Sequence, residues 1–436
     1  MPPGILSTRN SDRTEAVEGS SRDLPRLKIL FLITEDWAFV SHRLPLARAA
    51  QDAGAEMFVM THLSDLRFEL EREGFTVIPW NMLRRSLNPF REVGAFLQVI
   101  RAYRRVRPDL LYHVALKPVA YGGLAARLCG GTASVNEIAG MGHVFTSSNR
   151  RMRLLRRGLL TLLRLALGGK NTKTVLQNNE NRALLIKEGV VPLSRTTVIR
   201  GTGVNVEQFI PRPEPIGPPI VLLASRMLWE KGIGEFVEAA RLLRTRSINA
   251  RFVLVGKLDP ENPASIPEAQ INAWVDSSLI EWWGHQDDMA KVLAQANIVC
   301  LPSYAEGLPR VLVEAASCGR PIVTCDSPGC HDIVRHGENG LLVPIRNSDA
   351  LARAIEILIS DRELRARMGA RGREIVVREF DERIVIAQVL SVFKETAGGR
   401  WSAFHSELPK IRPIAGMSVD NTLKQTARHF LANRHS

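Results

Sequence analysis

Short apolar runs alternate with stretches of helical periodicity through the first half of the chain. From residue 27 onward the apolar runs lie at 28–34, 56–61, 75–79, 109–114, 132–138, 173–177 and 196–199. Runs of this length that are separated by helical patterns predict parallel strands joined by helices. Such a sheet is covered by helices, which is typical of an α/β domain.

The same alternation starts again at Pro219 and extends through the second half of the chain. Its later apolar runs lie at 251–256, 279–283, 297–301, 321–324 and 341–343. Residues 206–219, between the two series, are rich in proline, which stiffens a chain and removes backbone donors. We therefore predict two doubly wound, Rossmann-like domains, at 27–205 and 220–378, joined by a linker at 206–219.

Domains of this class bind ligands outside the carboxyl ends of their strands, so two of them facing each other would leave a cleft walled by strand-end loops. The length of 436 residues and the hydrophobic content of 45% are compatible with two ordinary cores. Residues 1–26 are rich in Ser, Arg, Glu and Pro and lack the apolar core of a secretory signal, which predicts a flexible arm and no export. Residues 399–436 are expected to form an irregular tail.

Two glutamates flank a predicted helix start in the second half. Glu306 precedes Gly307-Leu308-Pro, and Glu314 follows about two helical turns later. One acid could meet a sugar hydroxyl and the other a ribose, while free N–H groups of the helix start face a phosphate. The alternative is a solvated surface helix with two ordinary glutamates.

Two cations lie upstream in a loop between a predicted strand and a predicted helix. Arg226 and Lys231 could clamp a diphosphate, because the arginine fork fits phosphate oxygens in pairs and lysine adds a mobile charge. Together they could neutralise the charge that develops as a nucleoside diphosphate departs. The alternative is that both cations decorate a surface loop.

These two clusters together resemble the donor site of the retaining glycosyltransferases of family 4, which have the two-domain GT-B architecture. The resemblance covers approximately residues 27–396 and is closest to bacterial enzymes that extend lipid-linked saccharides. Segments that begin at Lys28, His42 and Pro108 resemble the family's first strand, its first helix, and a later strand and loop. Segments similar to those of the bacterial enzymes begin at Lys117, Ala139 and Ser327.

The resemblance implies roles for individual residues. Arg226, Lys231 and Glu306 would carry the chemistry without a general base, since a phosphate oxygen of the donor helps to take the acceptor proton. Glu314 would bind the ribose, and Gly307 and Leu308 would belong to the same donor loop. The resemblance also places Gly284 and His285 near the nucleobase, and His113, Lys117 and Glu137 on the acceptor side. In the segment 379–398, a helix at 382–396 would cross back to the first domain.

The positive charge is the second clue to function. The chain has 58 Lys and Arg against 45 Asp and Glu, a net charge of +13, which predicts an anionic partner. Residues 149–164 read as an amphipathic helix, and basic residues at 84–85 and 101–107 add to the charge of the first domain. The two sides of that helix are predicted as Arg150, Arg153, Arg157 and Arg164 against Met152, Leu155, Leu159 and Leu162.

A helix of this pattern is typical of attachment to the anionic inner face of a membrane, and it is too short to span one. The alternative is a domain helix whose leucines pack on the sheet. Nucleic acid is not expected as the anionic partner, because the aromatic content of 6% is not interleaved with the basic stretches and no nucleic-acid-binding signature is present.

The five cysteines form no C-x-x-C pair, which favours a reducing cytosol. No His, Cys or Asp cluster has metal-ligand spacing, so we predict no metal and no cofactor, with a UDP-sugar as donor substrate. The expected activity is transfer of a hexose or N-acetylhexosamine to a polyprenyl-diphosphate-linked saccharide, by an enzyme bound peripherally to the cytoplasmic membrane. The alternatives are a non-catalytic scaffold that binds sugar nucleotides and an epimerase with the same fold.

Overall fold

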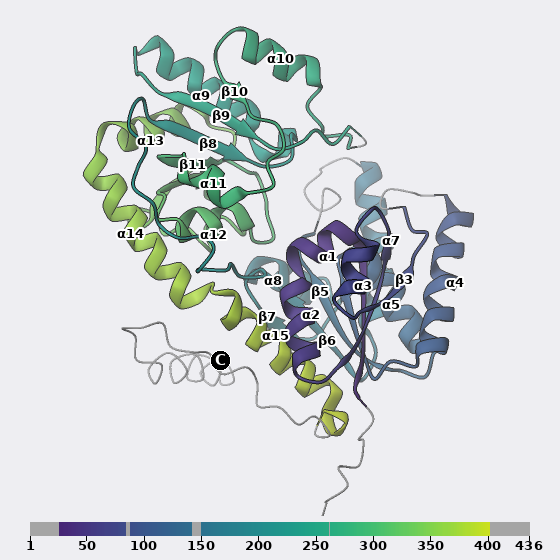
Figure 1. Ribbon diagram of the computed structural model, residues 1–436. Helices are drawn as coiled ribbons and strands as arrows, with labels where there is room; N and C mark the ends of the chain where they lie inside the picture. The colour runs from purple at the N-terminus through teal and green to yellow at the C-terminus, as the bar shows by residue number, and fades with distance from the viewer. Residues whose placement is uncertain (1–25, 84–87, 142–149, 261, 402–436) are drawn as a thin grey trace, which may run out of the picture.

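A computed structural model of the protein describes residues 26–83, 88–141, 150–260 and 262–401. The predicted N-terminal arm and nearly all of the predicted tail lie outside these residues. The described chain forms two α/β units, each built on its own parallel sheet (Figure 1). The prediction of two doubly wound domains is therefore confirmed.

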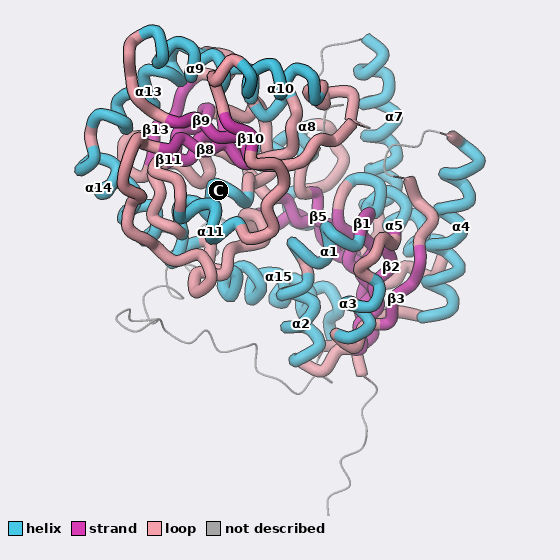
Figure 2. The backbone as a smooth tube through the Cα atoms, turned by 45° about the horizontal axis from the view of Figure 1, so that its top comes forward, coloured by secondary structure: helices cyan, strands magenta, loops and turns pink. Residues whose placement is uncertain are grey.

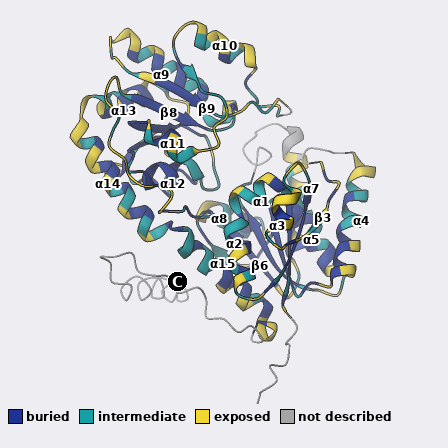
Figure 3. Cartoon of the chain, in the orientation of Figure 1, coloured by how far each residue is buried: buried dark blue, intermediate teal, exposed yellow. Residues whose placement is uncertain are grey.

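The first sheet has seven strands in the order β3-β2-β1-β4-β5-β6-β7, and all its neighbours are parallel. Its strands are β1 (Lys28–Glu35), β2 (Glu56–His62), β3 (Thr76–Pro79), β4 (Leu110–Val114), β5 (Ala133–Ile138), β6 (Thr172–Leu176) and β7 (Thr196–Val198). Each strand overlaps one of the apolar runs in the first half of the sequence. Parallel strands are buried on both faces, so their sequences are nearly continuous apolar runs. Most residues of these strands are buried (Figure 3).

Helices cover both faces of this sheet. The residues of one face, Phe31 and Tyr112 among them, pack with α1, α2 and the C-terminal helix. The opposite face packs with α4, α5 and α7. The helices of this unit are α1 (Asp36–His42), α2 (Leu44–Asp52), α3 (Arg67–Arg72), α4 (Pro89–Val106), α5 (Leu116–Leu128), α7 (Arg150–Leu167) and α8 (Asn179–Lys187).

The second sheet has six strands in the order β10-β9-β8-β11-β12-β13, again all parallel. These are β8 (Ile220–Ala224), β9 (Arg251–Val255), β10 (Glu281–Trp282), β11 (Ile298–Leu301), β12 (Ile322–Cys325) and β13 (Gly340–Val343). One continuous hydrophobic core joins this sheet to its helices. The helices are α9 (Ile233–Thr245), α10 (Glu268–Asp276), α11 (Met289–Ala294), α12 (Arg310–Ser317), α13 (Ser348–Ser360) and α14 (Arg362–Glu379).

The last helix, α15 (Glu382–Ala397), returns from the second unit to the first. Val385, Val389 and Phe393 lie one helical turn apart and are buried in the core of the first sheet. Phe393 makes edge-on contacts with Phe31 and Tyr112, with ring centroids 6.3 and 5.0 Å away. Two parts of the chain thus connect the units (Figure 2): α15 and the segment 199–219, which contains no helix or strand.

Candidate active site

A large cleft separates the two units, with a cavity volume of 1580 Å³. Trp37 and His42, from α1, line it on the side of the first unit. Arg226, His285 and Glu314 line it on the side of the second. Three predicted site residues, which are far apart in sequence, therefore face one cavity.

Lys231 and Glu306 meet beside this cleft. The Lys231 Nζ lies 2.5 Å from the Glu306 Oε1, and the two side chains are 16% and 13% exposed. Lys231 ends a 3-10 turn after β8, and Glu306 lies in the loop after β11, the neighbouring strand. Gly232, with φ of 73°, begins α9 here, and a Cβ on it would lie 2.2 Å from the Pro302 carbonyl oxygen. The turn that presents Lys231 therefore requires glycine at the next position.

Arg226 is held by a carboxylate that the sequence did not single out. Its Nη1 lies 2.8 Å from Oδ2 of Asp259, and both residues line the cleft. Asp259 follows β9, which pairs with β8, so the two strand-end loops are adjacent. Each of the two predicted phosphate-binding cations thus has a carboxylate partner within the same unit. Such a partner orients the cation and can be exchanged for phosphate oxygens.

Arg310 connects Glu314 to the first unit, a role that the sequence did not reveal. Its Nε lies 2.7 Å from the Glu314 Oε1, and its Nη1 donates a hydrogen bond to the Ser41 carbonyl. Burial raises the pKa of Glu314, while Arg310 opposes that effect. Burial and then the charges of Arg310 and Arg43 lower the pKa of His42 to about 3, so this histidine is neutral at physiological pH.

The other predicted donor-side residues are arranged around these pairs. His285 lines the cleft, and the Gly284 carbonyl accepts a hydrogen bond of 2.7 Å from the backbone of Gly256. Gly307 and Leu308 are not among the residues that line the cavity, nor are Lys231 and Glu306. Asn178 of the first unit donates hydrogen bonds to the carbonyl oxygens of Glu306 and Gly307. Their roles in donor binding stay predictions.

The acceptor-side role predicted for His113 is wrong. The residue lies within β4, in the predicted strand 109–114, and it is fully buried. Its ring nitrogens are 2.8 Å from the Tyr103 hydroxyl and 2.7 Å from Oδ1 of Asn136. Burial lowers the pKa of His113 to about 4, although the hydrogen bond with Asn136 opposes this. The residue therefore supports the packing of the first unit and does not face an acceptor.

Lys117 begins α5 and is paired with a carboxylate. Its Nζ lies 3.1 Å from Glu92 Oε2 of α4 and 3.0 Å from the Leu83 carbonyl oxygen. Leu83 lines the cleft, so Lys117 sits close to the cavity without being part of its lining. Its acceptor-side role stays a prediction.

Glu137, which the resemblance assigned to the acceptor side, lies near the end of β5 and has a basic partner. The carboxylate is buried and forms an ion pair with the buried Arg43. It also accepts hydrogen bonds from the Tyr112 hydroxyl and, at 3.0 Å, from the Gln177 amide. These contacts occupy both carboxylate oxygens, so Glu137 is a structural residue in this arrangement.

The basic helix α7 packs on the first unit mainly through Leu160, Leu163 and Leu167, which are buried. On the predicted apolar side, Leu155 is 48% exposed, whereas Leu159 and Leu162 are partly buried against the core. Part of this side thus packs on the domain, as in the alternative, and the membrane contact of the helix stays a prediction. Arg153 and Arg157 are exposed. Arg164 donates hydrogen bonds to the carbonyl oxygens of Glu188 and Gly189, just after α8. The structure does not describe the side chains of Arg150 and Met152. Within the described residues, no helix has the length and apolar character needed to span a membrane.

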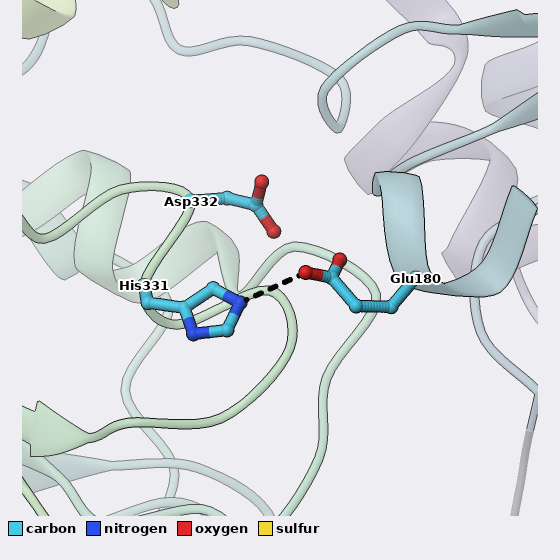
Figure 4. Close-up of side chains that lie close together, drawn as sticks. All are labelled: Glu180, His331 and Asp332. Carbon is cyan, nitrogen blue, oxygen red and sulfur yellow. Dashed lines mark hydrogen bonds and ion pairs between the residues drawn. The ribbon is translucent and has the colours of Figure 1, made fainter. Parts of the chain in front are cut away.

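Three residues with metal-ligating side chains meet at the junction of the units (Figure 4). Glu180 from α8 lies near His331 and Asp332 from the loop after β12, and their ligand atoms are within 4.8 Å of one another. The His331 Nε2 is 3.3 Å from Glu180, and its Nδ1 is 2.8 Å from Asp326. Residue spacing did not indicate this group, because Glu180 lies about 150 residues before the adjacent His331 and Asp332. The predicted independence of metal stays a prediction.

All five cysteines are free thiols, and four of them are buried. Burial raises the pKa of Cys318 and Cys330 to about 11, so both are protonated at physiological pH. They act as small apolar residues in the core of the second unit.

Comparison with known proteins identifies the family. A model of glycosyl transferases group 1 matches residues 206–375, and a glycosyl transferase 4-like model matches residues 28–179. The chain is 27% identical over 380 residues to the N,N'-diacetylbacillosaminyl-diphospho-undecaprenol alpha-1,3-N-acetylgalactosaminyltransferase of Campylobacter jejuni, covering 84% of this chain and 98% of that protein. It is 26% identical over 389 residues to the putative glycosyltransferase EpsD of Bacillus subtilis, with coverage of 84% and 97%.

Solved structures show the same fold. The sucrose-phosphate synthase of Thermosynechococcus elongatus superposes with a TM-score of 0.72 at 20% identity, covering 85% of this chain and 99% of that one. Anabaena Alr3699/HepE in complex with UDP and glucose gives a TM-score of 0.69 at 20% identity, with coverage of 85% and 100%. Together the two family models match well over half of the chain. The protein therefore belongs to the family 4 glycosyltransferases with the GT-B fold.

Proposed function

We propose that the protein is a retaining glycosyltransferase that moves a hexose or N-acetylhexosamine from a UDP-sugar to a polyprenyl-diphosphate-linked saccharide. The observation that carries this proposal is the ion pair of Lys231 and Glu306 at the carboxyl edge of the second sheet. Arg226, from the same strand-end loop as Lys231, and Glu314 line the cleft. The lipid-linked acceptor is supported by the similarity to the Campylobacter jejuni transferase, which extends over nearly the whole of that protein.

The proposed reaction needs positioning and charge stabilisation more than proton transfer by the protein. The bond between the anomeric carbon and the diphosphate breaks, and Arg226 and Lys231 stabilise the departing anion. The acceptor hydroxyl attacks from the face that the diphosphate leaves, and a diphosphate oxygen takes its proton. Because attack and departure occur on the same face, the configuration at the anomeric carbon is retained. Glu306 orients the sugar ring and Glu314 holds the ribose.

These roles predict different kinetic effects for the two glutamates. Glu306→Ala is expected to lower kcat by about 100-fold, because misplacement of the sugar by about 1 Å can have that effect. Glu314→Ala is expected mainly to raise KM for the donor, because the ribose contact is made equally in the ground and transition states. Steady-state kinetics with the donor varied at saturating acceptor measures both. Equal changes in kcat and KM for both variants would contradict the division.

The activity itself is tested with a panel of nucleotide sugars, with and without a bacterial membrane-lipid extract. Release of nucleoside diphosphate from one donor that depends on the lipid supports the proposal and identifies the sugar. The same assay with EDTA tests the proposed independence of metal, which fails if turnover is lost and a divalent ion restores it. Tight binding of a donor without release of diphosphate would favour the scaffold or the epimerase.

We also propose that the first unit docks on an anionic membrane surface through the start of α4. Phe90, Val93 and Leu97 lie on one side of this helix and are 87%, 58% and 42% exposed. The exposed Arg101 and Arg104 continue the same side. Apolar side chains followed by arginines fit a lipid interface. The helix begins at the carboxyl edge of the first sheet, so this surface would bring a lipid-linked acceptor to the cleft.

The docking surface predicts a specific loss of membrane binding. Phe90→Ser combined with Val93→Ser is expected to lower the partition coefficient onto vesicles containing anionic lipid, measured by flotation, by about 100-fold or more, since each buried side chain of this size contributes about 1.5–3 kcal/mol and about 1.4 kcal/mol corresponds to a factor of ten. Phe68→Ser is the matched control, because Phe68 of α3 is also highly exposed and lies outside this surface. Equal flotation of both variants, or wild-type protein that stays with the soluble fraction at low salt, would refute the proposal.

A further inference from the structure

Asn178 joins the two units through its side chain. It follows β6 of the first sheet and is fully buried at the start of α8, which lies at the junction of the units (Figures 1 and 2). Its Nδ2 donates to the Gly307 carbonyl oxygen at 2.9 Å and to the Glu306 carbonyl oxygen at 3.3 Å. Both acceptors belong to the second unit.

The orientation of this amide is fixed by its surroundings. The Asn178 Oδ1 accepts a hydrogen bond of 2.8 Å from the backbone N–H of Asn181 and so caps α8. Exchanging oxygen and nitrogen would place an oxygen against two carbonyl oxygens and a donor against an N–H group. The side chain therefore has two separate tasks, with its oxygen serving the helix and its nitrogen serving the other unit.

The loop that Asn178 holds has no room to shift toward the first unit. A Cβ on Gly307 would lie 1.5 Å from the Ala139 carbonyl oxygen, so the backbones of the two units are in direct contact here. On the other side, the Glu306 N–H donates to the Pro328 carbonyl oxygen at 3.1 Å. The backbone of Glu306 is thus held from both units, and its carboxylate reaches Lys231 from that position.

We propose that Asn178 is a positioning residue that couples closure of the two units to the placement of the Glu306 carboxylate. The inference rests on the proposed function, in which Glu306 orients the sugar. When the units are together, Asn178 fixes the carbonyl groups of Glu306 and Gly307. When they separate, Glu306 loses this support and keeps only the contacts of its own unit. The donor sugar is then oriented for reaction in the closed arrangement alone.

Asn178→Asp separates the two tasks of the side chain. Aspartate caps a helix as well as asparagine does, so α8 is retained, while the carboxylate faces two carbonyl oxygens and repels them. We expect kcat to fall by roughly 10- to 100-fold, with KM for the donor within about threefold of the wild-type value. The dissociation constant for UDP, measured by calorimetry, is expected to stay within about threefold as well, because UDP lacks the sugar that Glu306 orients.

Asn347→Asp is the matched control. Asn347 caps α13 by accepting a hydrogen bond of 2.8 Å from the N–H of Ala350, and it is exposed at the surface of the second unit. Its variant is expected to keep wild-type kcat. The inference is overturned if Asn178→Asp retains at least half of the wild-type kcat, or if its binding of UDP weakens as much as its kcat falls.

Hydrogen exchange tests the contact without any turnover. In the presence of UDP, amides of the segment 303–310 are expected to exchange about threefold faster in Asn178→Asp than in the wild type or in Asn347→Asp. Unchanged exchange would overturn the inference even if the protein transferred no sugar. Failure of the donor panel combined with faster exchange would instead reject the proposed function and keep the coupling of the two units.

Discussion

Lys231→Ala is expected to lower kcat by about 100- to 1000-fold, the effect of removing one group that stabilises developing negative charge. The departing diphosphate gains charge as the glycosidic bond breaks, and Lys231 is the cation that the structure places beside Glu306. KM for the donor should rise much less than kcat falls, because this charge grows in the transition state. Initial rates of nucleoside diphosphate release, with the donor varied, measure both quantities.

Two further variants separate charge from geometry at this position. Lys231→Arg keeps the positive charge, but the planar guanidinium group cannot occupy the position of the compact lysine ammonium group. Partial activity is therefore expected. Lys291→Ala removes an exposed lysine of the same unit, which pairs with Asp288, and should leave kcat unchanged. A Lys231→Ala protein that keeps more than a tenth of the wild-type kcat would remove Lys231 from the proposed mechanism.

The contact between Lys231 and Glu306 follows from the order of strands in the second sheet, which places their two loops side by side. β8 and β11 are neighbours, so the loops that leave their carboxyl ends are adjacent. The same rule applies to β8 and β9 and explains the pairing of Arg226 with Asp259. The sequence could have suggested Asp259 if the loop after the second strand had been considered as part of the site.

Contacts between the two units could not be predicted from sequence patterns. Apolar periodicity reports how a residue packs within its own unit, whereas Arg310 and Asn178 act on Ser41 and Gly307 of the opposite unit. The relative placement of two rigid bodies has no local signature. The sequence could predict Asn178 as a helix cap, since it precedes a helical pattern. It could not predict the hydrogen bonds of Asn178 to the opposite unit.

Buried polar residues were the other source of error. His113 was expected on the acceptor side from the family resemblance. The structure instead buries it, with Tyr103 and Asn136 satisfying both ring nitrogens. A polar residue is tolerated in a core when partners of this kind are present, and those partners come from a helix and a neighbouring strand. The sequence of β4 alone holds no information about them.

Glu137→Gln is expected to destabilise the first unit by about 3–5 kcal/mol, because it leaves the charge of Arg43 buried without a counter-charge. Arg43 and Glu137 have side chains that are 5% and 3% exposed, so water reaches neither. The Nε of Arg43 already lacks a hydrogen-bond partner among the described residues, so little remains to compensate the charge. The midpoint of unfolding in urea, followed by circular dichroism, measures the loss.

A double variant tests whether the unpaired charge is the cause. Glu137→Gln with Arg43→Met removes both charges, and replacing a buried pair by neutral side chains is often close to neutral in stability. The double variant should therefore be more stable than Glu137→Gln alone. Glu73→Gln is the control, because its pair with Arg48 has the same chemistry in an exposed setting, and a loss below about 1 kcal/mol is expected there. If the double variant were as unstable as the sum of the single ones, the packing of these side chains, and not the buried charge, would account for the loss.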